Sequence, residues 1–429
     1  MAQKTWRVGV AGLGTVGGGL LQFLAERPDF APAEGRVEVV AVSARSRSRP
    51  RTVDISNLAW YDDPVALASA PDVDIFVELI GGSDGPAKAA VETALRLGKP
   101  VITANKALLA EHGVELATLA ESSGAMLLYE AAVMGGAPAV KMLREAMVGD
   151  DVASVSGILN GTCNYILTEM EAGGRAFEDV LSEAQRLGYA EADPTMDVGG
   201  FDAAHKVTLL AALAFGCAPS YAAAHVQGIN DVELLDIKLA KELGYRIKLV
   251  AQASRGPDGV LVRVGPVLAP LDHPLAQANG ALNALFIEGT RIGRIFLQGP
   301  GAGAGPTAAA VAADIADVMA GGVRPVFQAP AETLRPFAAL DPSRSVGKAY
   351  IRLLVKDEPG VIAVIAETLA ECGVSIDSFL QKPAPDAGGV PIVLTTHATP
   401  ESVVTDAINR MEKLPAVLER PRLLRIARI

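Results

Sequence analysis

Residues 7–17 read Arg-Val-Gly-Val-Ala-Gly-Leu-Gly-Thr-Val-Gly, and this stretch decides the fold of the first part of the chain. Its first five residues predict a short buried strand, and a helix is expected from Gly18 to Arg27. Between them lies the pattern G-x-G-x-x-G, whose glycines permit a tight turn, close approach of the backbone to a pyrophosphate, and close packing of helix on strand. Such turns also merely connect elements, but this context predicts dinucleotide binding. The expected contacts are Gly12, Leu13, Gly14, Thr15 and Val16.

The second predicted strand, Val37–Val42, is followed by a loop of alternating hydroxyl and arginine residues from Ser43 to Arg49. Enzymes that prefer NAD usually carry Asp or Glu here to bind the ribose 2′-hydroxyl, whereas arginines suit the 2′-phosphate of NADP. The alternative is a solvated basic loop. We expect NADP, with Arg45 as its contact, and additional use of NAD stays open.

Two further strands are expected to end at the same edge of a parallel sheet, Asp74–Ile80 and Pro100–Ala104. Ligands bind beyond the carboxyl ends of such strands. We therefore expect Gly82 and Ser83 to border the dinucleotide, and Lys106 to reach the same edge. From its position alone, Lys106 could equally be an ordinary surface residue.

A second decisive stretch, Gly188–Lys206, holds four carboxylates, one histidine and one lysine. Pro194 and the glycines after it rule out a regular helix in the first part of this stretch. Residues at helical spacing begin near its C-terminal end. Asp202 and Lys206 are then i,i+4 neighbours on one helix face. They could form a surface ion pair. The apolar continuation Val207–Leu213 instead predicts a buried helix, and a buried lysine usually has a partner or a task.

This stretch resembles the signature of homoserine dehydrogenase without a gap, and Thr103-Ala104-Asn105-Lys106 resembles another segment of that family. The resemblance implies that Glu191 binds the substrate ammonium, that Asp202 binds and orients its reacting end, and that Lys206 donates the proton. It also implies that Lys106 lies beside the nicotinamide and the substrate.

The implied reaction is the reduction of L-aspartate 4-semialdehyde to L-homoserine by NADPH, a step towards threonine, methionine and isoleucine. As hydride reaches the aldehyde carbon, negative charge grows on the oxygen, and a lysine ammonium can stabilise that charge and supply the proton. Two alternatives remain open. One is a dehydrogenase of another small amino acid or aldehyde, and the other is an amino-acid sensor that keeps the dinucleotide domain as a scaffold.

The segment Met126–Pro138 closes the first domain. The family resemblance implies that it binds a monovalent cation, usually sodium, through backbone carbonyl groups. The implied ligands are Glu130, Val133, Gly135 and Ala137.

A second glycine-rich loop, Gly299–Thr307, precedes a helix within residues 306–320 that is expected to return to the dinucleotide domain. The loop could be a flexible linker, or it could cap that helix beside the nicotinamide. The resemblance favours the second interpretation, with Gly303 and Gly305 as contacts.

The middle of the chain, residues 139–330, predicts an α+β domain for the substrate. Segments such as Asp151–Leu159 read as strands separated by Gly and Pro turns, which suits an open mixed sheet with helices on one face and a dimer partner on the other. The resemblance implies a homodimer or homotetramer. Asn160 and Thr162 either line the substrate pocket or cap the next helix. Cys163 is expected to pack rather than to act as a nucleophile.

Residues 331–348 are rich in proline towards their start and predict a linker, and residues 349–429 predict the β-α-β-β-α-β order of a ferredoxin-like domain with its last strand at Val417–Leu424. With Asp-Glu-Pro-Gly-Val before its first helix, this domain resembles the ACT domain. ACT domains pair through strand edges and bind amino acids between partners. The resemblance implies threonine as an allosteric effector, with Gly360 and Asp377 as contacts.

Length and composition agree with a multidomain α/β enzyme. The 429 residues suggest two to four domains, the first at 1–138. The net charge of −11 argues against binding to nucleic acid. Three cysteines without a CxxC pair fit a reducing cytosol. We expect neither a signal peptide nor a membrane span, and therefore a cytoplasmic protein.

Overall fold

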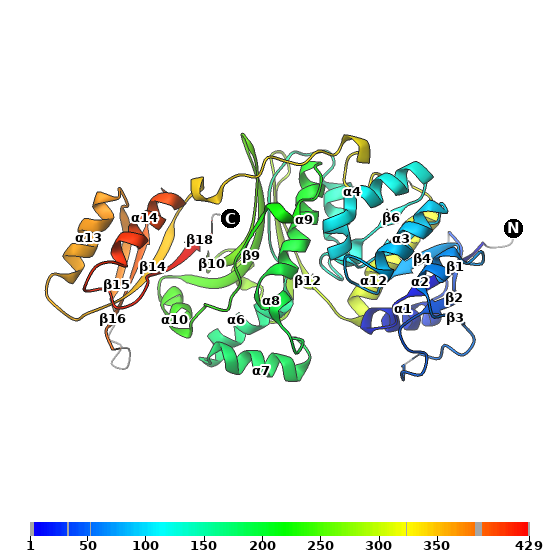
Figure 1. The fold of residues 1–429 in the computed structure, drawn as a ribbon, viewed down its shortest axis with the longest axis horizontal. Helices are drawn as coiled ribbons and strands as arrows, with labels where there is room; N and C mark the ends of the chain where they lie inside the picture. Colours follow the sequence, from blue (N-terminus) through cyan, green and yellow to red (C-terminus); the bar gives the residue numbers. More distant parts are fainter. Residues whose placement is uncertain (1–3, 32–33, 52, 323, 382–387, 428–429) are drawn as a thin grey trace.

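The computed structural model describes residues 4–31, 34–51, 53–322, 324–381 and 388–427. Three regions follow one another along its long axis: an N-terminal α/β region, a central sheet covered by helices, and a C-terminal α/β region (Figure 1). The outermost residues of the predicted first and last domains lie outside the described residues.

The N-terminal region is a Rossmann-type domain, as predicted. Its described strands form one parallel sheet in the order β3-β2-β1-β4-β5-β6, so the strand order reverses between β1 and β4. Dinucleotides bind beyond the carboxyl ends of strands at such a reversal. The strands are β1 (Thr5–Ala11), β2 (Arg36–Ser43), β3 (Ala59–Tyr61), β4 (Ile75–Glu78), β5 (Val101–Thr103) and β6 (Leu127–Leu128). The helices are α1 (Thr15–Glu26), α2 (Pro64–Ser69), α3 (Pro86–Arg96) and α4 (Lys106–Ser123).

The turn between β1 and α1 is tighter than expected. Helix α1 begins at Thr15 rather than at Gly18, because Gly14 already serves as its N-cap. Gly12 has a φ of +104°, and a Cβ at this position would lie 2.3 Å from the carbonyl oxygen of Leu79. Only glycine therefore fits this close crossing of two chain segments.

Helix α12 (Ala304–Ala320) comes from much later in the chain and packs against α1. The approach is so close that a Cβ on Gly19 would lie 2.6 Å from the carbonyl oxygen of Ala304. This contact brings the loop before α12 to the start of α1, as Figure 1 shows.

The central region is a mixed sheet packed against helices. Its strands are β7 (Val152–Ile158), β8 (Ala224–Val226), β9 (Tyr245–Gly256), β10 (Gly259–Pro270), β11 (Leu282–Gly289) and β12 (Gly293–Pro300). Its helical segments are Glu130–Ala132, α5 (Ala139–Lys141), Met142–Ala146, α6 (Gly161–Gly173), α7 (Phe177–Leu187), α8 (Thr195–Val198), α9 (Phe201–Phe215), Tyr221–Ala223, α10 (Leu234–Glu242) and α11 (Pro274–Gln277). The longer helices pack on one face of the sheet, while the short α11 packs with residues of the other.

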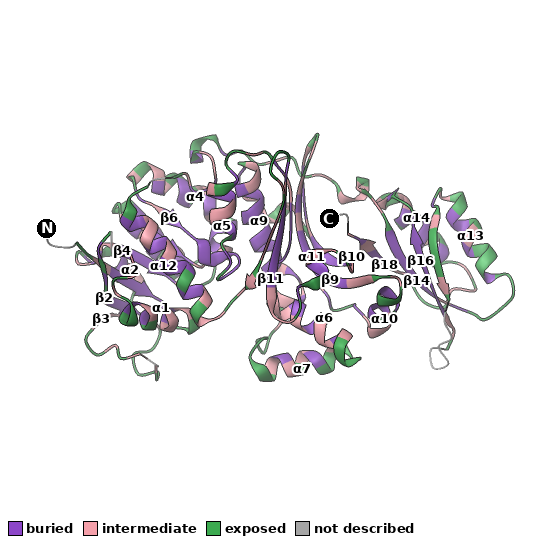
Figure 2. Cartoon of the chain, turned by 180° about the vertical axis from the view of Figure 1, so that it is seen from behind, coloured by how far each residue is buried: buried purple, intermediate pink, exposed green. Residues whose placement is uncertain are grey.

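Helix α9 is the buried centre of this region (Figure 2). Every residue from Asp202 to Leu213 is buried, and the helix contacts β7, β9 and β10. It begins at Phe201, as its sequence period predicts, after Gly200 in a left-handed conformation. Among the described residues, no helix combines the length and apolar character needed to cross a lipid bilayer.

The C-terminal region has the ferredoxin-like order of an ACT domain. Its strands are β14 (Ala349–Val355), β15 (Ile376–Gln381), β16 (Val390–Thr396) and β18 (Arg422–Ile426), and its helices are α13 (Val361–Glu371) and α14 (Glu401–Met411). Smaller elements are Ala331–Thr333, Pro342–Arg344, β13 (Val346–Gly347) and β17 (Thr399–Pro400). The expected last strand, Val417–Leu424, is wrong by several residues: Pro415 and Pro421 lack the N–H that a strand ladder needs, and Val417 forms only an isolated bridge.

The central and C-terminal sheets are continuous, which the sequence did not predict. Strand β18 pairs with β14 inside the ACT region and also runs parallel to β10, with Val267 opposite Arg425 and Leu268 opposite Ile426. The described order is β12-β11-β7-β9-β10-β18-β14-β16-β15. A single hydrogen-bonded sheet therefore joins the two regions.

Candidate functional site

A cavity of about 690 Å³ lies where the Rossmann domain meets the central region. It is bordered by the start of α1, the end of β5, the start of α6, one end of α9 and the loop before α12. Its lining includes Thr15, Val16, Ala104, Lys106, Val133, Asn160, Asp202, Lys206, Asn283, Gly301 and Gly303.

Two lysines meet one buried carboxylate in this cavity. The Nζ of Lys206 lies 2.9 Å from Oδ2 of Asp202 and 2.8 Å from the carbonyl oxygen of Leu159. The Nζ of Lys106 lies 3.1 Å from the other carboxylate oxygen of Asp202. The sequence predicted the pair on α9, and the fold adds Lys106 from the first turn of α4.

The charges of this cluster support one another. Burial acts to raise the pKa of Asp202, but the ammonium groups of Lys206 and Lys106 outweigh burial and hold that pKa well below its usual range. The pKa of Lys106 is raised, chiefly by the charge of Asp202. Asp202 is therefore ionised and Lys106 protonated at neutral pH.

Asn160 performs both of the roles that the sequence left open. Its side-chain oxygen accepts the N–H of Cys163 at 2.8 Å and so caps α6. Its amide nitrogen donates to Asp202 at 2.9 Å and to Asp197 at 2.7 Å. Asp197, whose pKa is raised mainly by burial, thus joins the cluster, although the sequence gave it no role.

Thr162 and Cys163, which follow Asn160 in the first turn of α6, bond to residues other than Asp202. Thr162 lines the cavity and donates its hydroxyl to the carbonyl oxygen of Tyr189 at 2.6 Å. The thiol of Cys163 is buried, and burial raises its pKa well above the ordinary value. A protonated, buried thiol suits packing rather than nucleophilic attack.

Glu191 is exposed on the loop between α7 and α8 and is not among the residues that line the cavity. Its charge contributes to the raised pKa of Lys106, so the carboxylate lies within electrostatic reach of the site. Its own backbone oxygen accepts a bond from the Gln185 amide at 3.0 Å.

A second cavity, of about 600 Å³, continues from the glycine-rich turn to the loop after β2. It is lined by Gly12, Leu13, Gly14, Arg45, Arg49 and Arg51, among others. An added Cβ on Gly14 would meet no atom within 4 Å, so the space over the turn is open. An open turn followed by basic side chains fits the pyrophosphate and ribose of a dinucleotide.

The basic loop is shaped by one of its own arginines. Arg51 donates to the carbonyl oxygens of Ser46 at 2.5 Å, Arg47 at 3.0 Å and Arg49 at 2.9 Å. The guanidinium group of Arg51 is occupied by these bonds. Among the three arginines that line the cavity, the exposed Arg45 and Arg49 are therefore better placed to bind a ligand.

The other predicted cofactor contacts lie close by. Gly82 and Ser83 follow β4 at the expected sheet edge but are not among the cavity-lining residues, and the Gly82 carbonyl accepts a bond from Asn105 at 2.7 Å. Gly303 lines the larger cavity as N-cap of α12, with a φ of +121°. Gly305 lies within the first turn of α12 and does not line it.

The four proposed cation ligands are buried on the loop after β6. Gly135 has a φ of +55°, and a Cβ there would lie 2.7 Å from the carbonyl carbon of Gly301. The Glu130 carboxylate accepts the N–H of Val140 at 3.0 Å and of Lys141 at 2.7 Å. The side chain of Glu130 therefore ties this loop to α5.

Sequence patterns did not identify two buried polar residues of the site. Glu78 at the end of β4 accepts bonds from the N–H of Ile80 at 2.7 Å and the hydroxyl of Thr103 at 2.6 Å, which ties two strand ends together. Asn283 lies in the cavity wall and donates to Leu159 at 3.1 Å. Each lies in a strand whose other residues are mostly apolar. A single polar residue in such a strand is the only sequence feature that could have indicated a role for it.

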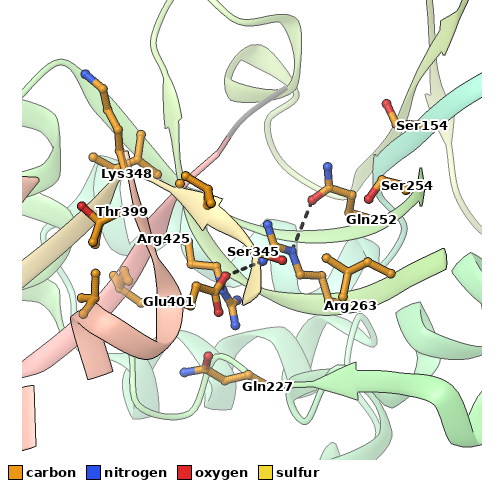
Figure 3. Close-up of a pocket in the computed structure, with 18 of the residues that line it drawn as sticks. Ser154, Gln227, Gln252, Ser254, Arg263, Ser345, Lys348, Thr399, Glu401 and Arg425 are labelled. Carbon is orange, nitrogen blue, oxygen red and sulfur yellow. Dashed lines mark hydrogen bonds and ion pairs between the residues drawn. The ribbon is translucent and has the colours of Figure 1, made fainter. Parts of the chain in front are cut away.

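A third cavity, of about 620 Å³, lies between the central sheet and the ACT domain (Figure 3). Glu401 of α14 accepts bonds there from Arg263 of β10 at 2.7 Å and Arg425 of β18 at 2.9 Å. Lys348 also borders this cavity and forms an ion pair with Asp377 at 2.9 Å. One of the predicted effector contacts is thus paired next to the domain junction.

Family models match most of the chain. They are described as homoserine dehydrogenase, NAD binding domain, over residues 12–130; homoserine dehydrogenase over 138–316; and ACT domain over 349–416. The homoserine dehydrogenase of Neisseria gonorrhoeae is 42% identical, covering 97% of both chains. The chain belongs to the homoserine dehydrogenase family.

Other homoserine dehydrogenases agree with this assignment. The one from Pseudomonas aeruginosa is 42% identical, covering 96% of this chain and 97% of its own length. The crystal structure of a homoserine dehydrogenase from Thiobacillus denitrificans superposes with a TM-score of 0.92 at 40% identity, covering 99% of this chain and 98% of that one. The oxidoreductase assignment, the NAD(P)-binding domain and the ACT domain follow from these matches.

Proposed function

We propose that this homoserine dehydrogenase reduces L-aspartate 4-semialdehyde to L-homoserine, preferring NADPH, as a step towards threonine, methionine and isoleucine. The observation that carries the proposal is the convergence of Lys206 and Lys106 on Asp202 inside a cavity that begins at the dinucleotide turn. When bound, the coenzyme supplies the hydride that reaches the aldehyde carbon.

The residues divide the remaining work. Asp202, ionised and fixed by Asn160, holds both ammonium groups in the cavity and orients the reacting end of the substrate. Lys206 stabilises the growing negative charge on the oxygen and gives it a proton, which leaves a neutral amine. Lys106 remains protonated beside the substrate and adds to the positive field. Glu191, exposed at the edge of the site, binds the substrate ammonium.

The same machinery runs in reverse. In homoserine oxidation the neutral Lys206 amine accepts the hydroxyl proton while hydride leaves the carbon for the oxidised coenzyme. Homoserine oxidation therefore requires the neutral form of this amine as its general base.

Preference for NADP rests on Arg45 and Arg49, which face the coenzyme cavity where a carboxylate would favour NAD. A hyperthermophilic archaeal homoserine dehydrogenase, 27% identical with a TM-score of 0.66, has been solved in complex with NADPH. The decisive assay compares homoserine oxidation with NADP⁺ and NAD⁺ and includes other small hydroxy amino acids. We expect the highest kcat/KM for homoserine with NADP⁺. Turnover of another substrate in preference to homoserine would contradict the proposal.

We infer a monovalent cation, sodium by the family resemblance, on the carbonyls of Glu130, Val133, Gly135 and Ala137. Buried carbonyls on a tight loop suit a hard cation. The test measures Tm in sodium, potassium and tetramethylammonium chloride at equal ionic strength. A higher Tm in sodium supports the site, and identical Tm values argue against it.

We further infer feedback inhibition by threonine through the ACT domain, with Gly360 and Asp377 as contacts. Gly360 is the N-cap of α13 with a φ of +89°, and no side chain caps this helix, so its N-terminus suits a carboxylate. Threonine should inhibit the wild-type enzyme, and Asp377→Ala should weaken inhibition while kcat stays the same. Equal inhibition of both proteins would rule out the contact.

The boundaries 1–138, 139–330, 331–348 and 349–429, and a homodimeric or homotetrameric assembly, belong to the same proposal. The three matched family ranges are compatible with those boundaries. The face of the central sheet away from α9 is the proposed dimer face. Light scattering on the purified enzyme tests the assembly, since a monomer at micromolar concentration would contradict it.

A further inference from the structure

We propose that Asn283 is a positioning residue that sets the direction of the Lys206 ammonium through a carbonyl group that the two side chains share. The inference rests on the proposed role of Lys206 as proton donor. Asn283 lies near the start of β11, far from Lys206 in sequence, and lines the same cavity.

One backbone oxygen accepts both side chains. The Leu159 carbonyl receives the Lys206 ammonium at 2.8 Å and the Asn283 amide nitrogen at 3.1 Å. Leu159 directly follows β7 and precedes Asn160, so its carbonyl lies between the end of that strand and the N-cap of α6. A carbonyl oxygen has two lone pairs, and two donors fix its direction more firmly than one.

Asn283 cannot easily turn away from this contact. A Cβ on Gly301 would lie 2.2 Å from the carboxamide carbon of Asn283, so the amide lies directly against the glycine backbone. Turning the amide over would place its oxygen against the Leu159 oxygen. The glycine backbone therefore restricts the plane of the amide, and the Leu159 oxygen determines which end of the amide faces it.

The oxygen of the Asn283 amide, unlike its nitrogen, has no hydrogen-bond partner among the described residues. Asn283 is 1% exposed, and this Oδ1 is buried. Leaving a buried acceptor unpaired destabilises the folded protein. An apolar side chain would avoid that cost, so the donor half of the amide is the part that the site uses.

The test compares Asn283→Ala and Asn283→Asp with the wild type in homoserine oxidation across pH. Asn283→Ala removes the second donor, and we expect kcat to fall by about 10- to 100-fold because the amine loses its alignment. The dissociation constant for NADPH should change less than about twofold. Asn283→Asp keeps the size and brings a carboxylate close to Lys206. This carboxylate would stabilise the charged form of the amine. The acid limb of the pH profile, where kcat falls at low pH, should therefore move up by about one pH unit.

Asn164→Ala is the matched control. Asn164 is also buried and donates to the carbonyl oxygens of Ala278 and of Leu282, the first residue of β11, but these bonds reach neither Lys206 nor Leu159. It should lower Tm and leave the acid limb where it is. The inference is overturned when the acid limb of Asn283→Asp stays in place, or when Asn283→Ala loses no more kcat than Asn164→Ala.

The variants distinguish a folding defect and a failure of the role proposed for Lys206 from a failure of the inference about Asn283. Should Asn283→Ala not fold, the isosteric Asn283→Asp decides alone. If Lys206→Ala itself oxidises homoserine, the proposed role of Lys206 as proton donor fails, and the inference about Asn283 fails with it. If Lys206→Ala is inactive and the Asn283 variants behave as wild type, only the present inference fails.

Discussion

At the residue scale, the site depends on one carboxylate with two cationic partners. Burying charged groups is costly, and replacing such clusters with apolar residues is often neutral or stabilising. Asp202 nevertheless lies buried between Lys206 and Lys106, with Asn160 as a third donor. In the proposed mechanism, this costly arrangement places two fixed positive charges where the substrate oxygen develops negative charge.

Arg45 gives the first residue-scale prediction. Arg45→Ala should raise KM for NADPH about tenfold, because one charge-assisted bond to the 2′-phosphate is lost. KM for NADH, which lacks this phosphate, should stay the same. Initial rates with both coenzymes provide the measurement, and an equal loss for both would show that Arg45 does not read the phosphate.

Lys248 gives a pH prediction. This fully buried lysine bonds to Asn164 at 2.8 Å and to the Ala278 carbonyl at 2.6 Å, and burial lowers its pKa from 10.5 to about 7. Between those two values the unfolded chain binds the proton and the folded chain does not, so stability rises with pH across that window.

Lys248→Met should remove this contribution. Its Tm should gain less than the wild-type Tm between pH 7 and pH 9, even though lost hydrogen bonds lower both values. Calorimetry at the two pH values tests this, and an unchanged difference in Tm would contradict the assigned titration.

Sequence patterns predict local pairs well and distant ones poorly. Asp202 and Lys206 are one helical turn apart, so the period of α9 places them together. Asn283 reaches the same carbonyl from another strand, and β-strand sequence does not tell which residue will face a cavity. The strand before Lys106 predicted only that this lysine reaches the ligand edge, and the family resemblance was needed to give it a role.

At the element scale, the β1–α1 turn separates two uses of glycine. Gly12 needs its φ of +104° and its contact with Leu79, whereas Gly14 has an ordinary negative φ and open space around it. Gly12→Ala should therefore lower Tm by at least about 5 °C.

Gly14→Ala is its matched control, because the added methyl group meets open space. It should leave Tm nearly unchanged and weaken NADPH binding, since the methyl group occupies the path of the pyrophosphate. Thermal unfolding and fluorescence titration measure the two effects. Similar losses of Tm in both variants would contradict the distinction.

Boundaries at this scale were predictable where breakers and periods agree. Helix α9 began where the glycine pair and the apolar period placed it. The last strand was predicted too early in the chain because its apolar residues suggested pairing. Pro415 and Pro421 lack the N–H groups that a strand ladder needs there. The early start of α1 reflects Gly14 acting as a cap, which periodicity does not report.

At the scale of the whole molecule, the ACT domain is fastened to the catalytic region by a sheet and by buried charges. Arg352 of β14, 2% exposed, bonds to Asp236 of α10 at 2.7 Å and to Glu233 at 2.8 Å. Tyr350 adds a bond to Asp236 at 2.9 Å. These contacts join regions more than a hundred residues apart, so no local pattern could predict them.

Arg352→Met should loosen this junction. It leaves the carboxylate of Asp236 buried without its cation, which costs about 3–5 kcal/mol. We expect a lower Tm and faster proteolysis within 331–348. Arg410→Met, which removes an exposed pair with Glu371, should change neither by much. Equal behaviour of the two variants would show that the junction does not depend on Arg352.

The most direct measurement is the activity of Lys206→Ala beside its affinity for NADPH. The account predicts that kcat falls at least about a hundredfold while NADPH still binds within about twofold of the wild-type affinity. Homoserine turnover above a tenth of the wild-type rate by this variant would contradict it.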